Sequence, residues 1–147
     1  MLRLIFIFAV LAFAAALMMG ANAHPVFGAF VTAYDAGKEV VPGLTSVAAP
    51  GHTPGHTAYM LSSGSGKLMV MSDLTNHPAL FVRNPDWAAV FDMDAEQARA
   101  TRRRMLDMAA TERAQVSFYH APFPATGHIA KDGNGYRFVP VQWNPAI

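Results

Sequence analysis

The chain has 147 residues, with 11 Lys and Arg against 10 Asp and Glu and no cysteine. This balance gives no basic bias toward a nucleic acid or an anionic membrane surface. Without disulfides, an exported chain of this length must be held together by one hydrophobic core, by a metal or by association, and it is too short for two domains.

The first 23 residues have the three-part layout of a secretory signal peptide. Arg3 gives a short basic region, an apolar run follows from Leu4 to Met19, and Ala21-Asn22-Ala23 fits a small-x-small cleavage site. The alternative is a membrane anchor, but a spanning helix needs about 20 apolar residues and this run is shorter. We therefore expect cleavage before His24, no membrane attachment afterwards, and a periplasmic or secreted product.

Short strand patterns follow an irregular segment at residues 24–37. Pro42-Gly43 and Gly64-Ser65-Gly66 are turn signals, and each separates two runs that are rich in strand-forming residues. The last of these runs is apolar from Leu68 to Met71, as in a strand that is buried on both faces. The strands expected from these patterns cover residues 38–41, 44–50, 57–63 and 67–73.

One long helix is expected after an irregular stretch at residues 75–91. Asp94 can cap the free amides of the first turn, Gln97 follows at capping-box spacing, and the helix runs to about Arg113. Arg102-Arg103-Arg104 has two interpretations, a phosphate-binding patch or the solvated side of the helix, and we favour the second. The inward-facing stripe at helical spacing consists of Ala98, Met105, Met108 and Ala109.

Strand patterns return after the helix. Residues 115–120 form an apolar run that ends on His120, and a loop from Ala121 leads into a short strand. Asp132-Gly133-Asn134-Gly135 is a hairpin turn before a last strand at residues 136–143. Strands, then a helix, then strands predict an α/β (α+β) fold, with a mostly antiparallel or mixed sheet and one long helix on one face.

Three side chains of metal-binding type stand at the ends of expected strands. His56 precedes one strand, Asp73 ends the next, and His120 ends a third. Strand ends project side chains into the loops where catalytic ligands are usually found. Two imidazoles and a carboxylate suit zinc, although any one of the six histidines alone is more often a surface or core residue.

Three stretches of this sequence resemble the metallo-β-lactamase superfamily, and within it the methyl parathion hydrolase-like branch. They are GHTPGH at residues 51–56, MVMSDL at 69–74 and FYHAPFPATGHIAKDGNGYRFVPV at 118–141. The resemblance covers roughly Lys38 to Pro145. It implies the C-terminal half of an αββα sandwich over residues 38–147, and hydrolysis of an ester, lactone, amide or phosphotriester bond by metal-activated hydroxide.

The resemblance also implies roles for individual residues. His56 would bind the first zinc, Asp73 would bridge both metals as the catalytic carboxylate, and His120 would bind the second zinc. Four further residues are expected in the second shell or the pocket, with His128 in the last loop: His52, His77, Tyr119 and His128.

The superfamily's His-x-His-x-Asp-His motif does not occur in this sequence. We therefore expect a truncated site that binds at most one zinc, weakly, through His56, Asp73 and His120. The sheet face that would meet the other half is expected to be exposed and to favour a homodimer. A small-molecule substrate is the partner expected of an active chain, and nucleic acid is not expected.

Three interpretations of function stay open. The chain is an exported metal-dependent hydrolase, or a non-catalytic remnant or partner-binding half-domain of the same fold, or a signal-anchored binding module unrelated to metal. A separate metal site at the N-terminus, made by the α-amine and imidazole of His24 after cleavage, competes with a disordered terminus, and we favour the disordered terminus.

Overall fold

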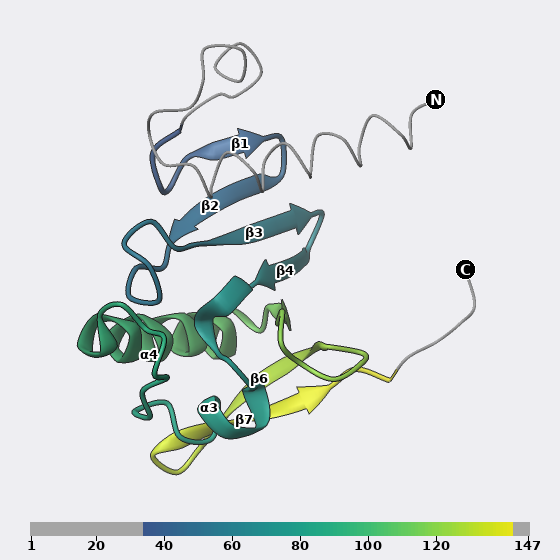
Figure 1. Cartoon of the computed structure of the whole chain (residues 1–147). Coiled ribbons are helices and arrows are strands. Elements are labelled where there is room, and N and C mark those ends of the chain that lie inside the picture. Colours follow the sequence, from purple (N-terminus) through teal and green to yellow (C-terminus); the bar gives the residue numbers. More distant parts are fainter. Residues whose placement is uncertain (1–33, 143–147) are drawn as a thin grey trace. The chain divides into compact units, whose positions relative to one another are not determined.

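The computed structural model describes residues 34–142, and the described residues from Asp35 onward belong to one compact unit (Figure 1). The expected signal peptide and His24 lie outside the described residues. The strands are β1 (Glu39–Val41), β2 (Leu44–Ala48), β3 (Thr57–Ser63), β4 (Gly66–Val70), β5 (Gln115–Ser117), β6 (Thr126–Asp132) and β7 (Gly135–Pro140). The helical elements are the 3-10 turn η1 (Ser72–Leu74) and the helices α3 (Pro78–Phe81) and α4 (Ala95–Glu112).

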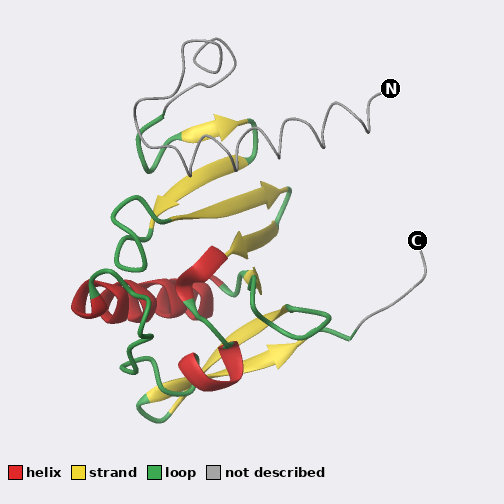
Figure 2. Cartoon of the chain, viewed as in Figure 1, coloured by secondary structure: helices red, strands yellow, loops and turns green. Residues whose placement is uncertain are grey.

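The seven strands form one sheet in sequence order, β1 to β7. Neighbouring strands are antiparallel except β4 and β5, which are parallel. Parallel neighbours need a long crossover connection, and here it contains η1, α3 and α4 (Figure 2). The predicted mixed sheet with one long helix is thereby confirmed.

The predicted hairpin turns are confirmed where local sequence determines them. Gly43 and Gly133 have φ of +82° and +56°, a left-handed conformation that glycine adopts without steric cost. The pairing of β6 with β7 closes between Asp132 and Gly135, as the Asp-Gly-Asn-Gly turn predicts.

Several predicted strands extend too far, and two of them lead to the candidate site. The strand expected at residues 67–73 ends at Val70, because Ser72 has a positive φ of 51° that extended backbone cannot accommodate. The strand expected at residues 115–120 ends at Ser117, where its pairing with β4 and β6 stops. Asp73 and His120 therefore lie on turns just beyond the strand ends, not on the strands.

Helix α3 interrupts the stretch that the sequence predicts to be irregular. Pro78 was expected to break structure, but it occupies the first helical turn, where its missing amide hydrogen costs no hydrogen bond. None of the helices in the described part of the chain is long and apolar enough to span a membrane.

Helix α4 begins and ends close to its predicted bounds. The Asp94 side chain accepts a hydrogen bond from the Gln97 backbone amide at 2.9 Å, which confirms the predicted cap. The helix ends at Glu112, and the next residue, Arg113, has a left-handed backbone conformation. The interpretation of the arginine run as a solvated face is wrong for Arg102, which is 2% exposed.

The core lies between α4 and one face of the sheet. It includes Met69 and Val116 from the sheet and Met105 and Leu106 from the helix. Met60 and Phe138 pack against this core, so by strand alternation Leu61 and Val139 point to the opposite face. These two side chains are 39% and 43% exposed, so this sheet face carries exposed apolar side chains in the described part of the chain.

Candidate metal centre

Asp73 and His120 form a close pair at the ends of two neighbouring strands. His120 Nε2 lies 2.8 Å from Asp73 Oδ1, and the two side chains are 55% and 32% exposed. Asp73 belongs to η1, shortly after β4, and His120 follows β5. Because β4 and β5 are parallel neighbours, their carboxyl ends meet at one sheet edge and bring the imidazole to the carboxylate.

His56 lies beside this pair, but both of its ring nitrogens already have partners. Nδ1 lies 2.7 Å from the Ala49 carbonyl oxygen, and Nε2 accepts a hydrogen bond from the Asp73 backbone amide at 3.0 Å. Burial lowers the pKa of His56, while the hydrogen bond to Ala49 and the Asp73 carboxylate act in the opposite direction. The neutral ring therefore donates through Nδ1 and accepts through Nε2.

His52 is held by a buried carboxylate. Its Nδ1 lies 3.2 Å from Asp92 Oδ1, and the Asp92 side chain is only 3% exposed. The other oxygen of Asp92 accepts from the Ala89 amide at 3.2 Å and lies 3.6 Å from Arg102 Nη2. The chain of contacts from Arg102 through Asp92 fixes the orientation of the His52 ring.

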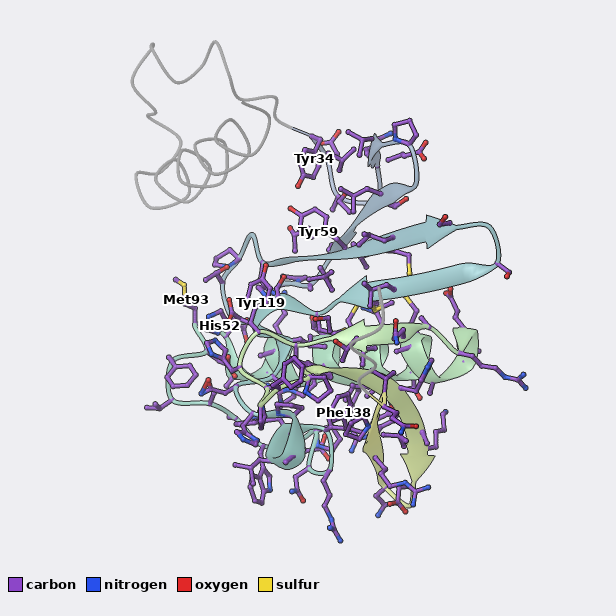
Figure 3. All side chains as sticks on the ribbon, turned by 90° about the vertical axis from the view of Figure 1, so that its right-hand side faces the viewer. Tyr34, His52, Tyr59, Met93, Tyr119 and Phe138 are labelled. Carbon is purple, nitrogen blue, oxygen red and sulfur yellow. The ribbon has the colours of Figure 1, made fainter. Side chains whose placement is uncertain are left out.

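His52 and the Asp73–His120 pair line one cavity of about 150 Å³. His52, Asp92 and Arg102 line it together with the Asp73–His120 pair, and Phe91 closes part of its wall. The Phe91 ring meets the His52 ring edge-on, with centroids 6.2 Å apart. Figure 3 shows where His52 and Tyr119 stand on the ribbon; Tyr119, next to His120, is 61% exposed.

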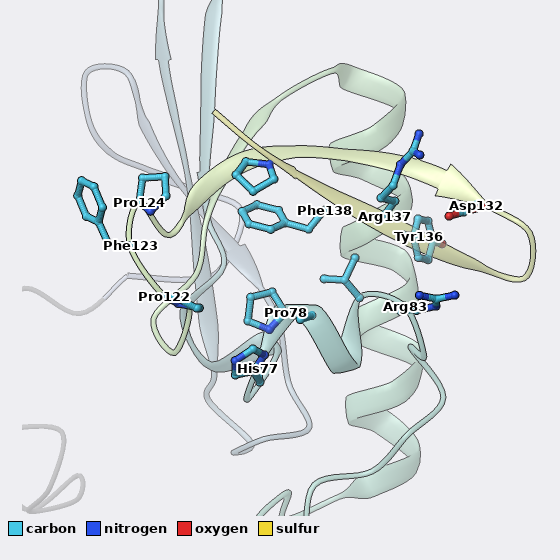
Figure 4. Close-up of a pocket in the computed structure, with 13 residues that line it drawn as sticks. His77, Pro78, Arg83, Pro122, Phe123, Pro124, Asp132, Tyr136, Arg137 and Phe138 are labelled. Atoms are coloured by element: carbon cyan, nitrogen blue, oxygen red, sulfur yellow. The ribbon is translucent and has the colours of Figure 1, made fainter. Parts of the chain in front are cut away.

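The other predicted pocket residues lie elsewhere. His77 lines a separate apolar cavity of about 400 Å³ between α3, the Pro122–Pro124 segment and β7 (Figure 4). Its Nδ1 is buried without a hydrogen-bond partner among the described residues. The prediction that His128 lies in the last loop is wrong, because His128 is an exposed residue within β6, opposite Gln115 and Val139.

Sequence reasoning missed Asp92 and Arg102. Asp92 is 40 positions from His52 in the chain, so no local spacing connects them. Arg102 belongs to a run of three arginines, in which nothing marks the one that turns inward. Only the packing of α4 against the segment at residues 85–92 identifies these two residues.

The described donors do not form a three-ligand zinc site. No group of three or more His, Cys, Asp or Glu among the residues at 34–142 could hold a metal ion in this arrangement. Asp73 and His120 are chemically suited to zinc, but the accepting nitrogen of His56 is engaged by a backbone amide. The metal set predicted from the resemblance, His56, Asp73 and His120, therefore stays a prediction.

Solved structures share the overall fold of this chain. AidC, a dizinc quorum-quenching lactonase, aligns over 80% of this chain at 30% identity with a TM-score of 0.75. AbOPH, a hydrolase in the beta lactamase superfamily, aligns over 76% at 27% identity with a TM-score of 0.70. This chain is a partial metallo-β-lactamase-fold domain.

Other comparisons set the scope of this assignment. A probable metal-dependent hydrolase from Staphylococcus aureus has the same metallo-β-lactamase fold, at 22% identity over 82% of this chain with a TM-score of 0.66. This chain spans 40%, 38% and 43% of these three structures. No family model and no curated protein matches the chain. The methyl parathion hydrolase-like branch stays a prediction.

Proposed function

We propose that this chain serves in metal-dependent hydrolysis of an ester, lactone, amide or phosphotriester bond, with zinc as the metal. The observation that supports this most strongly is the Asp73–His120 pair, set at the ends of β4 and β5 in a metallo-β-lactamase fold. AidC is a dizinc lactonase and AbOPH a hydrolase, and a dizinc centre supplies activated hydroxide and charge stabilisation when it is loaded.

The roles of this chain's own residues follow from their contacts. Asp73 offers a carboxylate that is partly open to solvent, and its oxygen orients the imidazole of His120. A catalytic zinc ordinarily has three protein ligands and a water molecule, whereas the described residues bring two such donors together. We therefore propose that a competent centre needs donors beyond this pair, either from elsewhere or from a second copy.

The hydrolysis assay compares wild type with Asp73→Ala. Aryl ester, lactone and phosphotriester substrates are incubated with each protein, with added zinc chloride or with EDTA. We expect wild type alone to act close to the background rate, because positioning errors of about 1 Å can cost roughly a hundredfold in rate. Any zinc-dependent turnover above background should disappear in Asp73→Ala. Turnover that persists in Asp73→Ala and in EDTA would contradict the proposed function.

A second candidate is a non-catalytic, partner-binding half-domain. The exposed apolar side chains Leu61 and Val139, on the sheet face opposite α4, favour it. Its expected partner is a second copy of this chain, joined through that face. Sedimentation analysis should then give a dimer that Leu61→Glu dissociates, and a wild-type monomer at tens of micromolar would exclude it.

Export is proposed from the sequence of the first 23 residues. The mature protein should begin at His24 and be recovered from the periplasm or the medium. Intact-mass measurement of the exported protein tests this expectation. Recovery of the full-length chain in the membrane fraction would support the anchor instead.

A further inference from the structure

The cavity of about 400 Å³ beside α3, hereafter the α3 cavity, is separate from the candidate metal centre. It lies between α3, the Pro122–Pro124 segment and β7 (Figure 4), and none of its lining residues lines the cavity of about 150 Å³. Small-molecule sites are typically hollows of about 300–1,000 Å³ with apolar walls and a few polar groups. The α3 cavity has this size, so its walls decide which ligand it fits.

Most of the wall of the α3 cavity is apolar. Its prolines are Pro78, Pro122, Pro124 and Pro140. Val82 and the Phe138 ring also line it, and the Phe138 ring is held edge-on against Phe118, with centroids 5.5 Å apart. Phe118 is only 2% exposed, so the Phe138 ring has a fixed position. An aromatic ligand can pack against such a ring in an offset or edge-on arrangement.

Backbone hydrogen bonds fix the three segments that surround the α3 cavity. The Tyr136 amide donates to the Val82 carbonyl at 3.1 Å, which joins β7 to the end of α3. The Phe118 amide donates to the Ala125 carbonyl at 3.0 Å, and the Ala125 amide donates to the Pro122 carbonyl at 2.8 Å. A cavity whose walls are already fixed loses little conformational entropy when a ligand binds.

One end of the α3 cavity carries positive charge. Arg83 and Arg137 line it, both are exposed, and neither guanidinium makes a hydrogen bond or an ion pair with the described residues. Asp132 is the single carboxylate among the lining residues. Figure 4 shows these three residues at the end away from His77. Because a guanidinium fork matches the two oxygens of a carboxylate, this end favours a ligand with a carboxylate group.

We propose that the α3 cavity binds a small aromatic monocarboxylate, with its ring against Phe138 and its carboxylate at the end formed by Arg83 and Arg137. A neutral aromatic ligand would leave the two guanidinium groups without a partner, and an inorganic anion would leave the apolar wall in contact with water. The inference does not rest on the proposed function, because no metal and no residue of the candidate metal centre takes part.

The test is a titration of ¹⁵N-labelled wild type with phenylacetate in EDTA, followed by the amide chemical shifts. We expect the amides of Val82 and Phe138 to shift and to saturate with a Kd of about 1 mM or tighter. Phenylacetamide, the neutral counterpart, should bind about tenfold more weakly, because it lacks charge-assisted hydrogen bonds. Acetate, which lacks the ring, should bind too weakly to saturate.

Variants test the two parts of the α3 cavity separately. Combining Arg83→Gln with Arg137→Gln should weaken phenylacetate binding about tenfold and leave phenylacetamide binding unchanged. Ala79→Phe, at an exposed position of α3 that lines the cavity, should fill it and weaken the binding of both compounds. Arg113→Gln and Leu80→Phe are the matched controls, at exposed positions outside the lining, and should bind as wild type does.

Equal binding of phenylacetate and phenylacetamide, unchanged binding in the double arginine variant or in Ala79→Phe, or no saturation in wild type overturns the inference. Asp73→Ala should bind phenylacetate as wild type does. Binding that needs Asp73 or added zinc would put the ligand at the candidate metal centre, which overturns the inference while the proposed function stands. Zinc-independent turnover in the hydrolysis assay overturns the proposed function and leaves this inference intact.

Discussion

Replacing Arg102 with alanine should lower the free energy of unfolding by about 3–5 kcal/mol, because it leaves a buried carboxylate without its cation. The guanidinium donates to the carbonyls of Leu74, Pro85 and Trp87 at 2.9, 2.8 and 2.6 Å. It also lies 3.6 Å from Asp92 and covers the Phe81 ring at 4.9 Å. One side chain thus joins α4 to the segments on both sides of α3.

Urea unfolding followed by circular dichroism measures this loss, which is a large part of the 5–15 kcal/mol typical of a folded domain. Arg99→Ala is the matched control, since Arg99 lies on the same helix and makes no hydrogen bond or ion pair to the described residues. Arg102→Lys should recover only part of the loss, because an ammonium group lacks the planar fork of donors. Equal unfolding midpoints for Arg102→Ala and Arg99→Ala would contradict this account.

Gly51→Ala is expected to lower the free energy of unfolding by about 2–5 kcal/mol, through backbone strain and overpacking together. Gly51 has φ of +132°, and a Cβ there would overlap the backbone nitrogen and Cα of Ala98 in the first turn of α4. The turn and the helix start are also joined directly, since the Asp94 amide donates to the Gly51 carbonyl at 2.9 Å.

Gly55, in the same Gly-His-Thr-Pro-Gly-His turn as Gly51, provides the control for this prediction. A Cβ at Gly55 would meet no atom within 4 Å, so Gly55→Ala should change the unfolding midpoint little. Differential scanning calorimetry of the two variants beside wild type gives the comparison. If Gly55→Ala proved as damaging as Gly51→Ala, contact with α4 would not be the reason for glycine at position 51.

Sequence patterns correctly predicted the elements whose structure depends on residues close to one another in the chain. Strand β3 has its predicted bounds and the Asp94 cap is present, because strand propensity and capping depend on residues within a few positions. The ends of β4 and β5 could not be predicted, because they depend on the positive φ of Ser72 and on where β5 stops pairing with its neighbours.

The contact between Asp73 and His120 agrees with the sequence expectation, whereas their metal-binding roles stay predictions. The resemblance pointed to Asp73 and His120, and they meet at one sheet edge. It could not identify the carboxylate behind His52, because Asp92 reaches that ring only through the packing of the segment before α4. It also gave no sign that the Asp73 backbone amide occupies the accepting nitrogen of His56.

The most direct test of a zinc site on the Asp73–His120 pair is equilibrium dialysis of wild type and Asp73→Ala against zinc chloride, with metal content measured per chain. The proposed site predicts at most one zinc per wild-type chain, weakly held, lost in Asp73→Ala and weaker at acid pH because imidazole donors must be deprotonated. Equal zinc content in wild type and Asp73→Ala, or two tightly held zinc ions in a monomeric wild type, would contradict it.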